Sequence, residues 1–501
     1  MRIRVLVRLV SILCLAFVWT AAAAEASFVM AGFDGDESVL QWESNAFFSR
    51  MEARSGIHFT FEVYADFPKW QEAKQRMFSS GPLPDVFFKA ALSTEESLRY
   101  TESGQIIDLK PLLEENAPHL WALLTEHPQW MEAITLPNGK IGALPSINQL
   151  PPQNAMWINK QWLDELKLDM PADAQSLMTV LRAFRLQDPN RNGQRDEVPL
   201  AFLGSWDLKF LSHAFGAVAN DYNLYTDADG IVHYWPLEDS FVELLRYLRE
   251  MYREELLDQD GFFTMDAMRI STDQKAPVRY GMFFGPNPFI LSNYEENVQF
   301  VLLPPLRYDG RQIYRDLYGE ILRGTFAISS ACTDPAALLR WVDVLYTDEG
   351  AIEAMAGLEG VDYFLDEDGY WMWKGGLDNL TMEQINDTTL YSTGNMPWLF
   401  PLDFHSRFGE EGVRRINDEL LKIRPYLTTP APLPSLTLEE NARVLPLQNE
   451  LGAFVDESFA RFVLGQDDLT DESIDMFRQG LLERGTNEMI AFWQEVFERT
   501  H

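Results

Sequence analysis

Apolar and polar residues alternate with two different periods along the first part of the chain. Residues 57–64 are apolar at every second position, which is typical of a β-strand with one buried face. Residues 38–56 carry large apolar side chains at helical spacing and end at a glycine, so we predict a helix there. The same criteria predict strands at 27–32 and 84–88, and a helix at 69–81. Alternating strands and helices predict an α/β fold with a mostly parallel sheet, in which ligands bind near the carboxyl ends of the strands.

The rest of the chain is richer in helical periodicity. Residues 158–171, 173–187 and 240–258 each place apolar side chains on one helical face. Two other segments, 225–235 and 364–373, carry an Asp-Gly pair between aromatic-rich runs, which is typical of β-hairpins. The acids of these two segments are of the type that binds metals, but we interpret them as turn residues.

The first 24 residues have the pattern of a secretory signal peptide. Three arginines precede a short apolar run that ends in alanines, so we expect cleavage after Ala24 or Ala26. The alternative is an N-terminal anchor helix, but the apolar run is short for a membrane span. Cys14 lacks the small preceding residue that a lipoprotein site needs, so we expect no lipid anchor. The protein is therefore predicted to be periplasmic or extracellular.

Composition and charge narrow the possible functions. A chain of 501 residues with 46% hydrophobic residues can bury a sizeable core. Its formal net charge of −35 becomes −38 once the three arginines of the signal peptide are removed, which makes nucleic acid a poor partner. Cys14 leaves with the signal peptide, so Cys332 has no partner for an intramolecular disulfide.

A polar loop at residues 188–197 begins as an EF-hand calcium loop does, with oxygen-bearing side chains at alternate positions and Gly193 at the sharp turn. Its twelfth position, where an EF-hand carries Glu, is Pro199. The alternative is a polar turn without an ion, since Asp, Asn and Gly favour turns by themselves. The candidate metal ligands are Asp188, Asn190, Asn192, the backbone carbonyl of Gln194, Asp196 and Glu197.

Four segments resemble, in order, segments of bacterial extracellular solute-binding proteins (family 1-like) that serve carbohydrate ABC importers. They are SSGPLPDVFF, WINKQWLDELKLDMP, DPNRNGQRDEVPL and WVDVLYTDEGAIEAMAGLEGVDY, and they lie between residues 79 and 363. The third is similar to a loop of the long, oligosaccharide-binding branch of these proteins. Two departures from the family pattern are Lys167, which stands where the family usually has Gly, and the lack of a lipoprotein site.

The resemblance implies an α/β, two-lobed periplasmic-binding-protein (Venus flytrap) fold with a hinge and a helix-rich second lobe. The implied N-terminal lobe comprises residues 25–150 plus about 320–375, and the C-terminal lobe residues 151–319 plus about 376–501. The resemblance also implies a monomer that captures a sugar or oligosaccharide and delivers it to the membrane permease subunits of an ABC transporter. In the polar loop it implies that Glu197 replaces the missing Glu and that the ion is a structural Ca²⁺.

A sugar site needs aromatic platforms and hydrogen-bonding side chains, because sugars present apolar C–H faces and hydroxyl edges. The chain has 14 Trp, 17 Tyr and 33 Phe, most of which must lie in the core. The alternative for each candidate aromatic residue is therefore a place in the core, and for Asp85 it is a cap at the start of a strand. The candidate ligand-binding residues, which follow predicted strands or lie near the presumed hinge, are Trp42, Asp85, Trp206, Phe283, Phe284, Asn287, Tyr318, Glu320, Arg323 and Trp398.

Two other classes of protein share the acidity, the aromatic content and the calcium loop: a secreted glycoside hydrolase and a surface glycan adhesin. A hydrolase needs two carboxylates that flank the scissile bond. No motif singles out such a pair among the 76 acidic residues, and the Gly-x-Ser-x-Gly, His-Glu-x-x-His and P-loop motifs are missing. We therefore predict a binding protein and not an enzyme.

Overall fold

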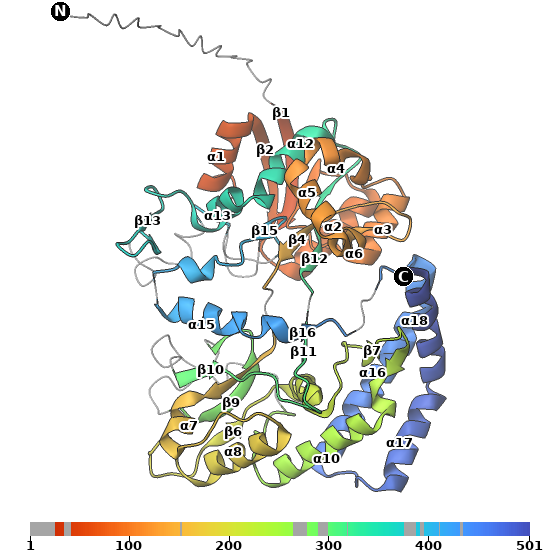
Figure 1. Ribbon diagram of the computed structural model, residues 1–501. Coiled ribbons are helices and arrows are strands. Elements are labelled where there is room, and N and C mark those ends of the chain that lie inside the picture. Colours follow the sequence, from red (N-terminus) through yellow and green to blue (C-terminus); the bar gives the residue numbers. More distant parts are fainter. Residues whose placement is uncertain are drawn as a thin grey trace, which may run out of the picture.

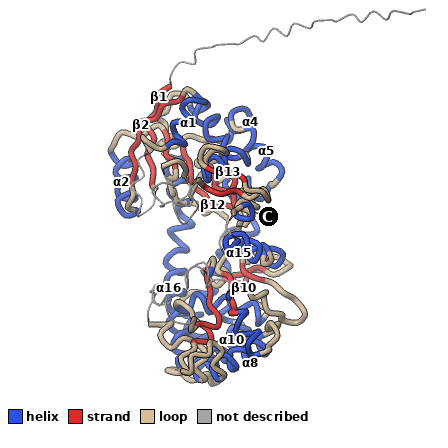
Figure 2. The backbone as a smooth tube through the Cα atoms, turned by 90° about the vertical axis from the view of Figure 1, so that its left-hand side faces the viewer, coloured by secondary structure: helices blue, strands red, loops and turns tan. Residues whose placement is uncertain are grey.

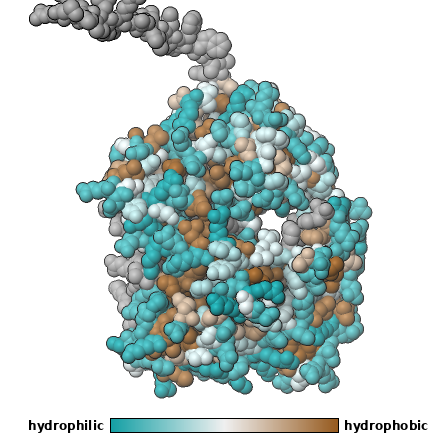
Figure 3. Space-filling view, viewed as in Figure 1, coloured by the Kyte–Doolittle hydropathy of each residue, from teal (hydrophilic) through white to brown (hydrophobic). Residues whose placement is uncertain are grey.

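The computed structural model divides into two lobes, which lie one above the other in Figure 1. It describes residues 26–500 except for 35–41, 151–152, 264–277, 289–298, 318, 375–386, 391–394, 410 and 431–433. The predicted signal peptide lies outside the described residues. Hydrophilic residues cover most of the face seen in Figure 3, as the high content of acidic residues leads us to expect.

The N-terminal lobe is built around a six-stranded sheet in the order β15-β4-β12-β3-β1-β2. β12 is antiparallel to β3 and β4, and the other neighbouring pairs are parallel. The prediction of an α/β fold with a mostly parallel sheet is thus confirmed for this lobe. The strands are β1 (Ala26–Phe33), β2 (Ile57–Tyr64), β3 (Val86–Phe88), β4 (Leu144–Asn148), β12 (Ile321–Ile328) and β15 (Leu399–Phe400).

Helices pack on both faces of this sheet. Met30 of β1 belongs to a core cluster on one face, whereas its neighbour Ala31 belongs to a second cluster on the other face. The helices of the first cluster are α1 (Ala46–Ser55), α4 (Lys110–Asn116), α5 (Pro118–Glu126), α6 (Pro128–Ile134), α12 (Pro335–Asp343) and α13 (Asp348–Ala356). Those of the second are α2 (Phe67–Ser80) and α3 (Thr94–Glu102).

In β1 and β2 the sequence explains how the strands pack. β2 confirms the predicted alternation: Ile57 and Phe59 are buried, and the residue after each is exposed. Gly32 of β1 lies so close to β3 that an added Cβ would stand 2.0 Å from the carbonyl oxygen of Phe88. Any larger residue at this position would push the two strands apart.

The C-terminal lobe has a four-stranded sheet in the order β10-β5-β9-β6 and is richer in helix. Its strands are β5 (Ala155–Asn159), β6 (Val198–Leu200), β9 (Tyr280–Gly285) and β10 (Phe300–Leu302); β5 is antiparallel to β9 and β10, and β6 is parallel to β9. Its helices are α7 (Lys160–Leu166), α8 (Ala174–Leu186), α9 (Gly204–Lys209), α10 (Asp239–Arg253), α15 (Glu411–Leu421), α16 (Leu438–Leu464), α17 (Asp471–Glu483) and α18 (Thr486–Thr500).

Both predicted hairpins are confirmed. β7 (Leu224–Thr226) pairs with β8 (Val232–Tyr234), and β13 (Tyr363–Leu365) pairs with β14 (Trp371–Trp373), each pair antiparallel. In each turn the first aspartate accepts hydrogen bonds from two backbone N–H groups further along the turn. These carboxylates therefore serve the turn itself.

The chain passes between the lobes several times. The chain crosses from the N-terminal to the C-terminal lobe between β4 and β5, returns between β11 (Tyr314–Arg315) and β12, and crosses again between β15 and α15. β16 (Leu427–Thr428) pairs with β11 and leads to α16. One core cluster contains buried residues from the ranges 28–147 and 326–408, and the other from the ranges 155–314 and 416–496. Each core is therefore made from two separate stretches of the chain.

Candidate ligand cleft and calcium loop

The carboxyl ends of strands from both sheets meet at the boundary between the lobes. β4 crosses to the other lobe directly after its last residue, so β1, β2 and β3, which run in the same direction as β4, also end on this side. β5 begins directly after that crossing, so β6, β9 and β10, which run in the opposite direction to β5, end at the boundary as well. The gap between the lobes, where these strand ends meet, is thus the place where a ligand would meet both sheets.

Trp206 lies on the C-terminal side of this gap, on the helix α9 that follows β6. It is 40% exposed, and its indole Nε1 donates a hydrogen bond to Asp221 Oδ1 at 3.0 Å. Arg315 binds the same carboxylate oxygen at 2.7 Å and stands over the ring of Phe210. Burial would raise the pKa of Asp221, but Arg315 and the Trp206 indole outweigh it and hold the pKa below its ordinary value. The site thus offers an aromatic platform bordered by an ionised Asp–Arg pair.

Two further carboxylates hold α9 in place. Asp207, which is buried, accepts hydrogen bonds from the Leu203 backbone N–H at 2.7 Å and from Asn154 Nδ2 at 2.9 Å. Burial raises the pKa of Asp207 to about 6. Asp456 of α16 accepts hydrogen bonds from Ser205 Oγ at 3.0 Å and from Lys209 Nζ at 2.7 Å. These bonds flank Trp206 on both sides along the chain and fix its orientation.

On the N-terminal side, a buried ion pair lies at the carboxyl ends of β1 and β3. Asp34 and Lys89 are both fully buried and form a salt bridge, and Asp34 Oδ2 accepts a hydrogen bond from the Trp42 indole at 2.5 Å. Burial lowers the pKa of Lys89, and the charge of Asp34 opposes that shift. Trp42 is itself completely buried against the rings of Phe48, Phe61 and Phe88. Its place in this structure is therefore in the core, the alternative that the sequence left open.

Four other candidates also lie away from the gap or inside a core. Phe283 and Phe284 are 2% and 6% exposed, because helices and loops cover β9 on both faces. Trp398 is 5% exposed and packs against Phe400 in the N-terminal core. Asp85 precedes β3, at the strand end far from the gap, and its Oδ2 accepts a hydrogen bond from the Val29 backbone N–H at 2.7 Å. It thus caps the start of β3, as in the second interpretation of this residue.

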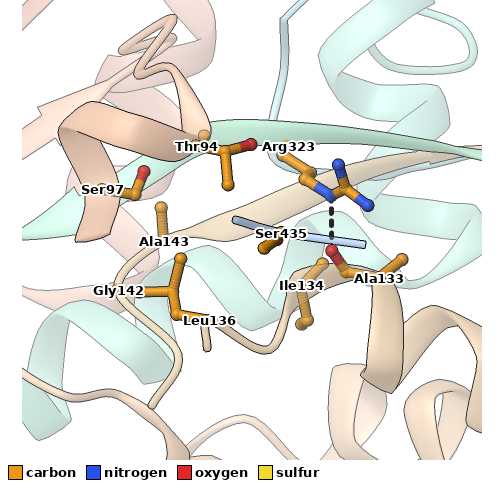
Figure 4. Close-up of a pocket in the computed structure, with 10 residues that line it drawn as sticks. Thr94, Ser97, Ala133, Ile134, Leu136, Gly142, Ala143, Arg323 and Ser435 are labelled. Atoms are coloured by element: carbon orange, nitrogen blue, oxygen red, sulfur yellow. Dashed lines mark hydrogen bonds between the residues drawn. The ribbon is translucent and has the colours of Figure 1, made fainter. Parts of the chain in front are cut away.

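Three candidates do lie at the lobe boundary. Asn287 follows the carboxyl end of β9 and is half-buried. Glu320 accepts a hydrogen bond from the Trp130 indole at 2.8 Å. Arg323 donates to the carbonyl oxygen of Ala133 (Figure 4), and burial lowers its pKa. The tenth candidate, Tyr318, lies outside the described residues.

The sequence did not reveal the polar residues that surround α9. Asp221, Arg315 and Asp456 come from three distant parts of the chain and stand in no motif. Only the fold brings these residues to α9.

The polar loop 188–197 connects the end of α8 to the start of β6. Asp188 accepts hydrogen bonds from the backbone N–H groups of Asn192 at 3.1 Å and Gly193 at 3.0 Å, and Asn192 Oδ1 accepts one from the Gln194 N–H at 2.7 Å. Gly193 has a φ of 75°, in the left-handed region that the turn requires. Side-chain oxygens from alternate residues thus point toward the inside of the turn.

Glu197 places a buried carboxylate in this loop. It is 4% exposed, and both of its carboxylate oxygens are buried without a hydrogen-bond partner among the described residues. Burial raises the pKa of Glu197, and the nearby charges of Asp188 and Asp196 raise it further. Within the described ranges, no three Asp, Glu, His or Cys side chains already stand in a metal-binding arrangement, and the loop mixes carboxylates with amides. Its composition and the buried, unpartnered carboxylate fit a hard cation such as Ca²⁺.

Comparisons with known proteins agree with this architecture. The chain is 30% identical over 329 residues to the fructooligosaccharide ABC transporter substrate-binding protein FusA of Streptococcus pneumoniae serotype 4, a match that covers 62% of this chain and 60% of FusA. The chain thus spans less than two thirds of this relative's length in the match. No family model matches the sequence.

Solved structures match over almost the whole chain. An extracellular solute-binding protein from Bifidobacterium longum subsp. infantis superposes with a TM-score of 0.81 at 19% identity, covering 96% of this chain and 99% of that one. An EF-hand mutant of S. pneumoniae FusA in complex with fructo-nystose superposes with a TM-score of 0.74 at 22% identity, covering 94% and 99%.

The fold is therefore that of the two-lobed solute-binding proteins, which confirms the fold predicted from the sequence. Over the matched residues, the sequence is also similar to that of one substrate-binding protein of an ABC transporter, FusA. Of the helices in the described part of the chain, none is long and apolar enough to cross a membrane.

Proposed function

We propose that this protein binds an oligosaccharide in the gap between its lobes and delivers it to the permease subunits of an ABC importer. The observation that carries the proposal is Trp206, an exposed indole at the carboxyl end of β6 with the Asp221–Arg315 pair beside it. An indole face stacks on the C–H face of a sugar ring, and the ion pair can exchange hydrogen bonds with its hydroxyl groups. The names of FusA and of the solved structures support the same class of ligand.

The structure narrows the proposed ligand set. We retain Trp206, Asn287, Glu320 and Arg323, which lie at the lobe boundary, and add Asp221 and Arg315. We also propose lobe limits that follow the two core clusters, with residues 321–408 completing the N-terminal lobe and 411–500 the C-terminal lobe. The segment after residue 375 thus contributes to the N-terminal core before the chain crosses.

Calcium forms a second part of the proposal. Asp188, Asn190, Asn192, Asp196, Glu197 and the carbonyl of Gln194 would surround a structural Ca²⁺ that joins α8 to β6. The buried carboxylate of Glu197, with two other acids beside it, is the observation that supports this site. An EF-hand mutant of FusA has been made, which indicates that the relative has such a loop.

The remaining parts of the proposal concern the class of protein, a binding protein and not an enzyme, and its location outside the cytoplasm. A binding protein for an importer works as a monomer outside the cytoplasmic membrane and does not turn over its ligand. A secreted hydrolase would need two carboxylates facing the sugar, whereas Asp221, the carboxylate that accepts the Trp206 hydrogen bond, is already paired with Arg315. Periplasmic or extracellular location follows from the signal peptide that the sequence predicts.

One experiment tests ligand class and enzyme activity together. The protein is titrated calorimetrically, in the presence of Ca²⁺, with neutral oligosaccharides that include fructo-nystose, and the sugars are analysed afterwards. We expect binding of one sugar per chain, with the sugar recovered intact and the protein more compact in solution scattering. Shortened sugar would instead support the hydrolase, and binding without any compaction would support an adhesin.

A further inference from the structure

Helix α16 packs in the C-terminal core, yet its first turn touches the N-terminal lobe. Val444, Leu451, Val455 and Phe459 of α16 are buried in the C-terminal core cluster. In contrast, Asn441 Nδ2 donates a hydrogen bond to Glu95 Oε2 at 2.9 Å, and Glu95 lies in the first turn of α3. Figure 2 shows α16 running alongside the gap between the lobes. The contact therefore bridges the two lobes outside the crossing strands.

The segment that leads into α16 adds to this contact. Ser435 lies in a small hollow whose other lining residues all belong to the N-terminal lobe (Figure 4). Those residues come from α3, from the end of α6, from the segment before β4 and from β12: Thr94, Ser97, Ala133, Ile134, Leu136, Gly142, Ala143, Arg323 and Gly324. The C-terminal lobe thus reaches across the boundary with a loop and a helix end.

Other contacts within each lobe hold the two residues of this hydrogen bond, Asn441 and Glu95, in position. Thr437 and Glu440 form a capping box that fixes the first turn of α16, and Arg499 of α18 pairs with Glu440. On the other side, Glu95 forms an ion pair with Arg99 one turn further along α3. Since both ends are already ordered, forming the contact costs little side-chain entropy.

We propose that the Asn441–Glu95 contact is a latch that restrains the opening of the lobes on the side of α16. The crossing segments lie between the sheets, so bending there moves α3 relative to the first turn of α16. The hydrogen bond stabilises the arrangement in which these two helix ends touch, and its loss frees the lobes to separate. The latch rests on the two-lobed fold and holds whether or not the ligand is a sugar.

The test changes the charge that faces Glu95. Asn441→Asp places a carboxylate opposite Glu95 and weakens the latch, whereas Asn441→Lys forms an ion pair and strengthens it. Ala442→Asp is the matched control, because it adds the same charge to an exposed neighbouring position of the same turn. An added acid is also favourable near a helix N-terminus, so the Asp variants keep α16 intact.

The readout is the distance between the lobes without any ligand. Spin labels at Thr60→Cys and Met476→Cys, both exposed positions, report it by pulsed electron resonance in mature protein with Cys332 replaced by alanine. We expect Asn441→Asp and Asn441→Lys to shift the ratio of long to short distances in opposite directions, each by about two- to tenfold, the worth of one hydrogen bond. Equal shifts in both variants, a shift in the Ala442→Asp control, or no shift in either Asn441 variant would overturn the latch.

Discussion

Removal of calcium should destabilise the C-terminal lobe, because it leaves the buried carboxylate of Glu197 without a cation beside it. The perturbation is chelation of a metal-stripped sample, followed by addition of Ca²⁺. Glu197 is buried, and neither of its carboxylate oxygens has a hydrogen-bond partner among the described residues. A bound Ca²⁺ would therefore compensate a charge that these residues leave uncompensated. At a hundred times its Kd, an ion that binds only the folded state stabilises it by about 2.7 kcal/mol.

That free energy translates into a measurable change in melting temperature. A domain of this size gains about 2–4 °C per kcal/mol, so Ca²⁺ should raise the melting temperature by about 5–10 °C. Differential scanning calorimetry, with and without chelator, measures the change. Glu197→Gln should abolish the response to Ca²⁺ and, without the ion, should be at least as stable as the wild type, because a neutral amide replaces a buried, unpaired charge.

The matched control lies in the β7–β8 hairpin, whose turn also contains an Asp-Gly pair but no buried carboxylate. Asp229→Asn should leave the response to Ca²⁺ intact, since Asp229 is exposed. The reasoning fails if the stripped protein melts at the same temperature with chelator and with Ca²⁺. It also fails if Glu197→Gln keeps the full response.

Three further predictions concern α9 and its supports. Trp206→Ala should weaken sugar binding by about 2 kcal/mol, or about thirtyfold in Kd by calorimetry, whereas Met476→Ala, which removes a side chain 62% exposed on α17, should have no effect; equal losses would contradict the platform. Asp456→Asn should lower the melting temperature by at most about 4 °C but weaken binding up to about fivefold, since partly exposed ion pairs contribute about 0.2–1 kcal/mol and this one orients α9; unchanged affinity would show that α9 holds its place alone. Because burial raises the pKa of Asp207 from 3.8 to about 6, its contribution favours the folded state at low pH and is lost as pH rises through about 6. Urea unfolding between pH 4 and 7 should therefore show a fall of up to about 3 kcal/mol that Asp207→Asn removes, and an identical pH dependence in both proteins would refute the assignment.

The elements that the sequence predicted correctly are those set by local pattern. The alternation in β2 and the hairpin turns at Asp-Gly each depend on a few consecutive residues. The helix predicted at 38–56 is shorter in the structure, where α1 begins at Ala46 after the N-cap Asn45. Phe47, Phe48 and Met51 lie in this helix as their spacing predicts, and Asn45 sets its start because its side chain accepts a hydrogen bond from the Phe47 N–H.

The choice of ligand-binding aromatics could not be made locally. Trp42 and Trp206 both stand near turns after a strand, but three phenylalanine rings from other elements cover Trp42 and none covers Trp206 completely. Phe283 and Phe284 are adjacent in a strand, where alternation would expose one of them; both are buried because β9 is covered on its two faces. What separates platform from core is the packing of distant segments, which no motif in the sequence records.

The calcium loop and the aromatic platform stand at opposite ends of one short strand, so removal of calcium should also weaken sugar binding. Glu197 immediately precedes β6, and Trp206 lies on α9, which begins four residues after β6 ends. β6 is a strand of three residues that pairs with β9 through Val198 and Leu200, and on its other side only a single bridge, from Leu200 to Leu257, is described. With the ion absent, the loop no longer fixes the start of this strand, and the position of α9 becomes less well defined. We expect chelation to raise the Kd for a bound oligosaccharide about three- to tenfold at temperatures well below melting, an effect of about 0.7–1.4 kcal/mol. Calorimetric titration at 15–20 °C, with and without chelator, measures this directly; an unchanged Kd would show that the loop stabilises the lobe without reaching the cleft.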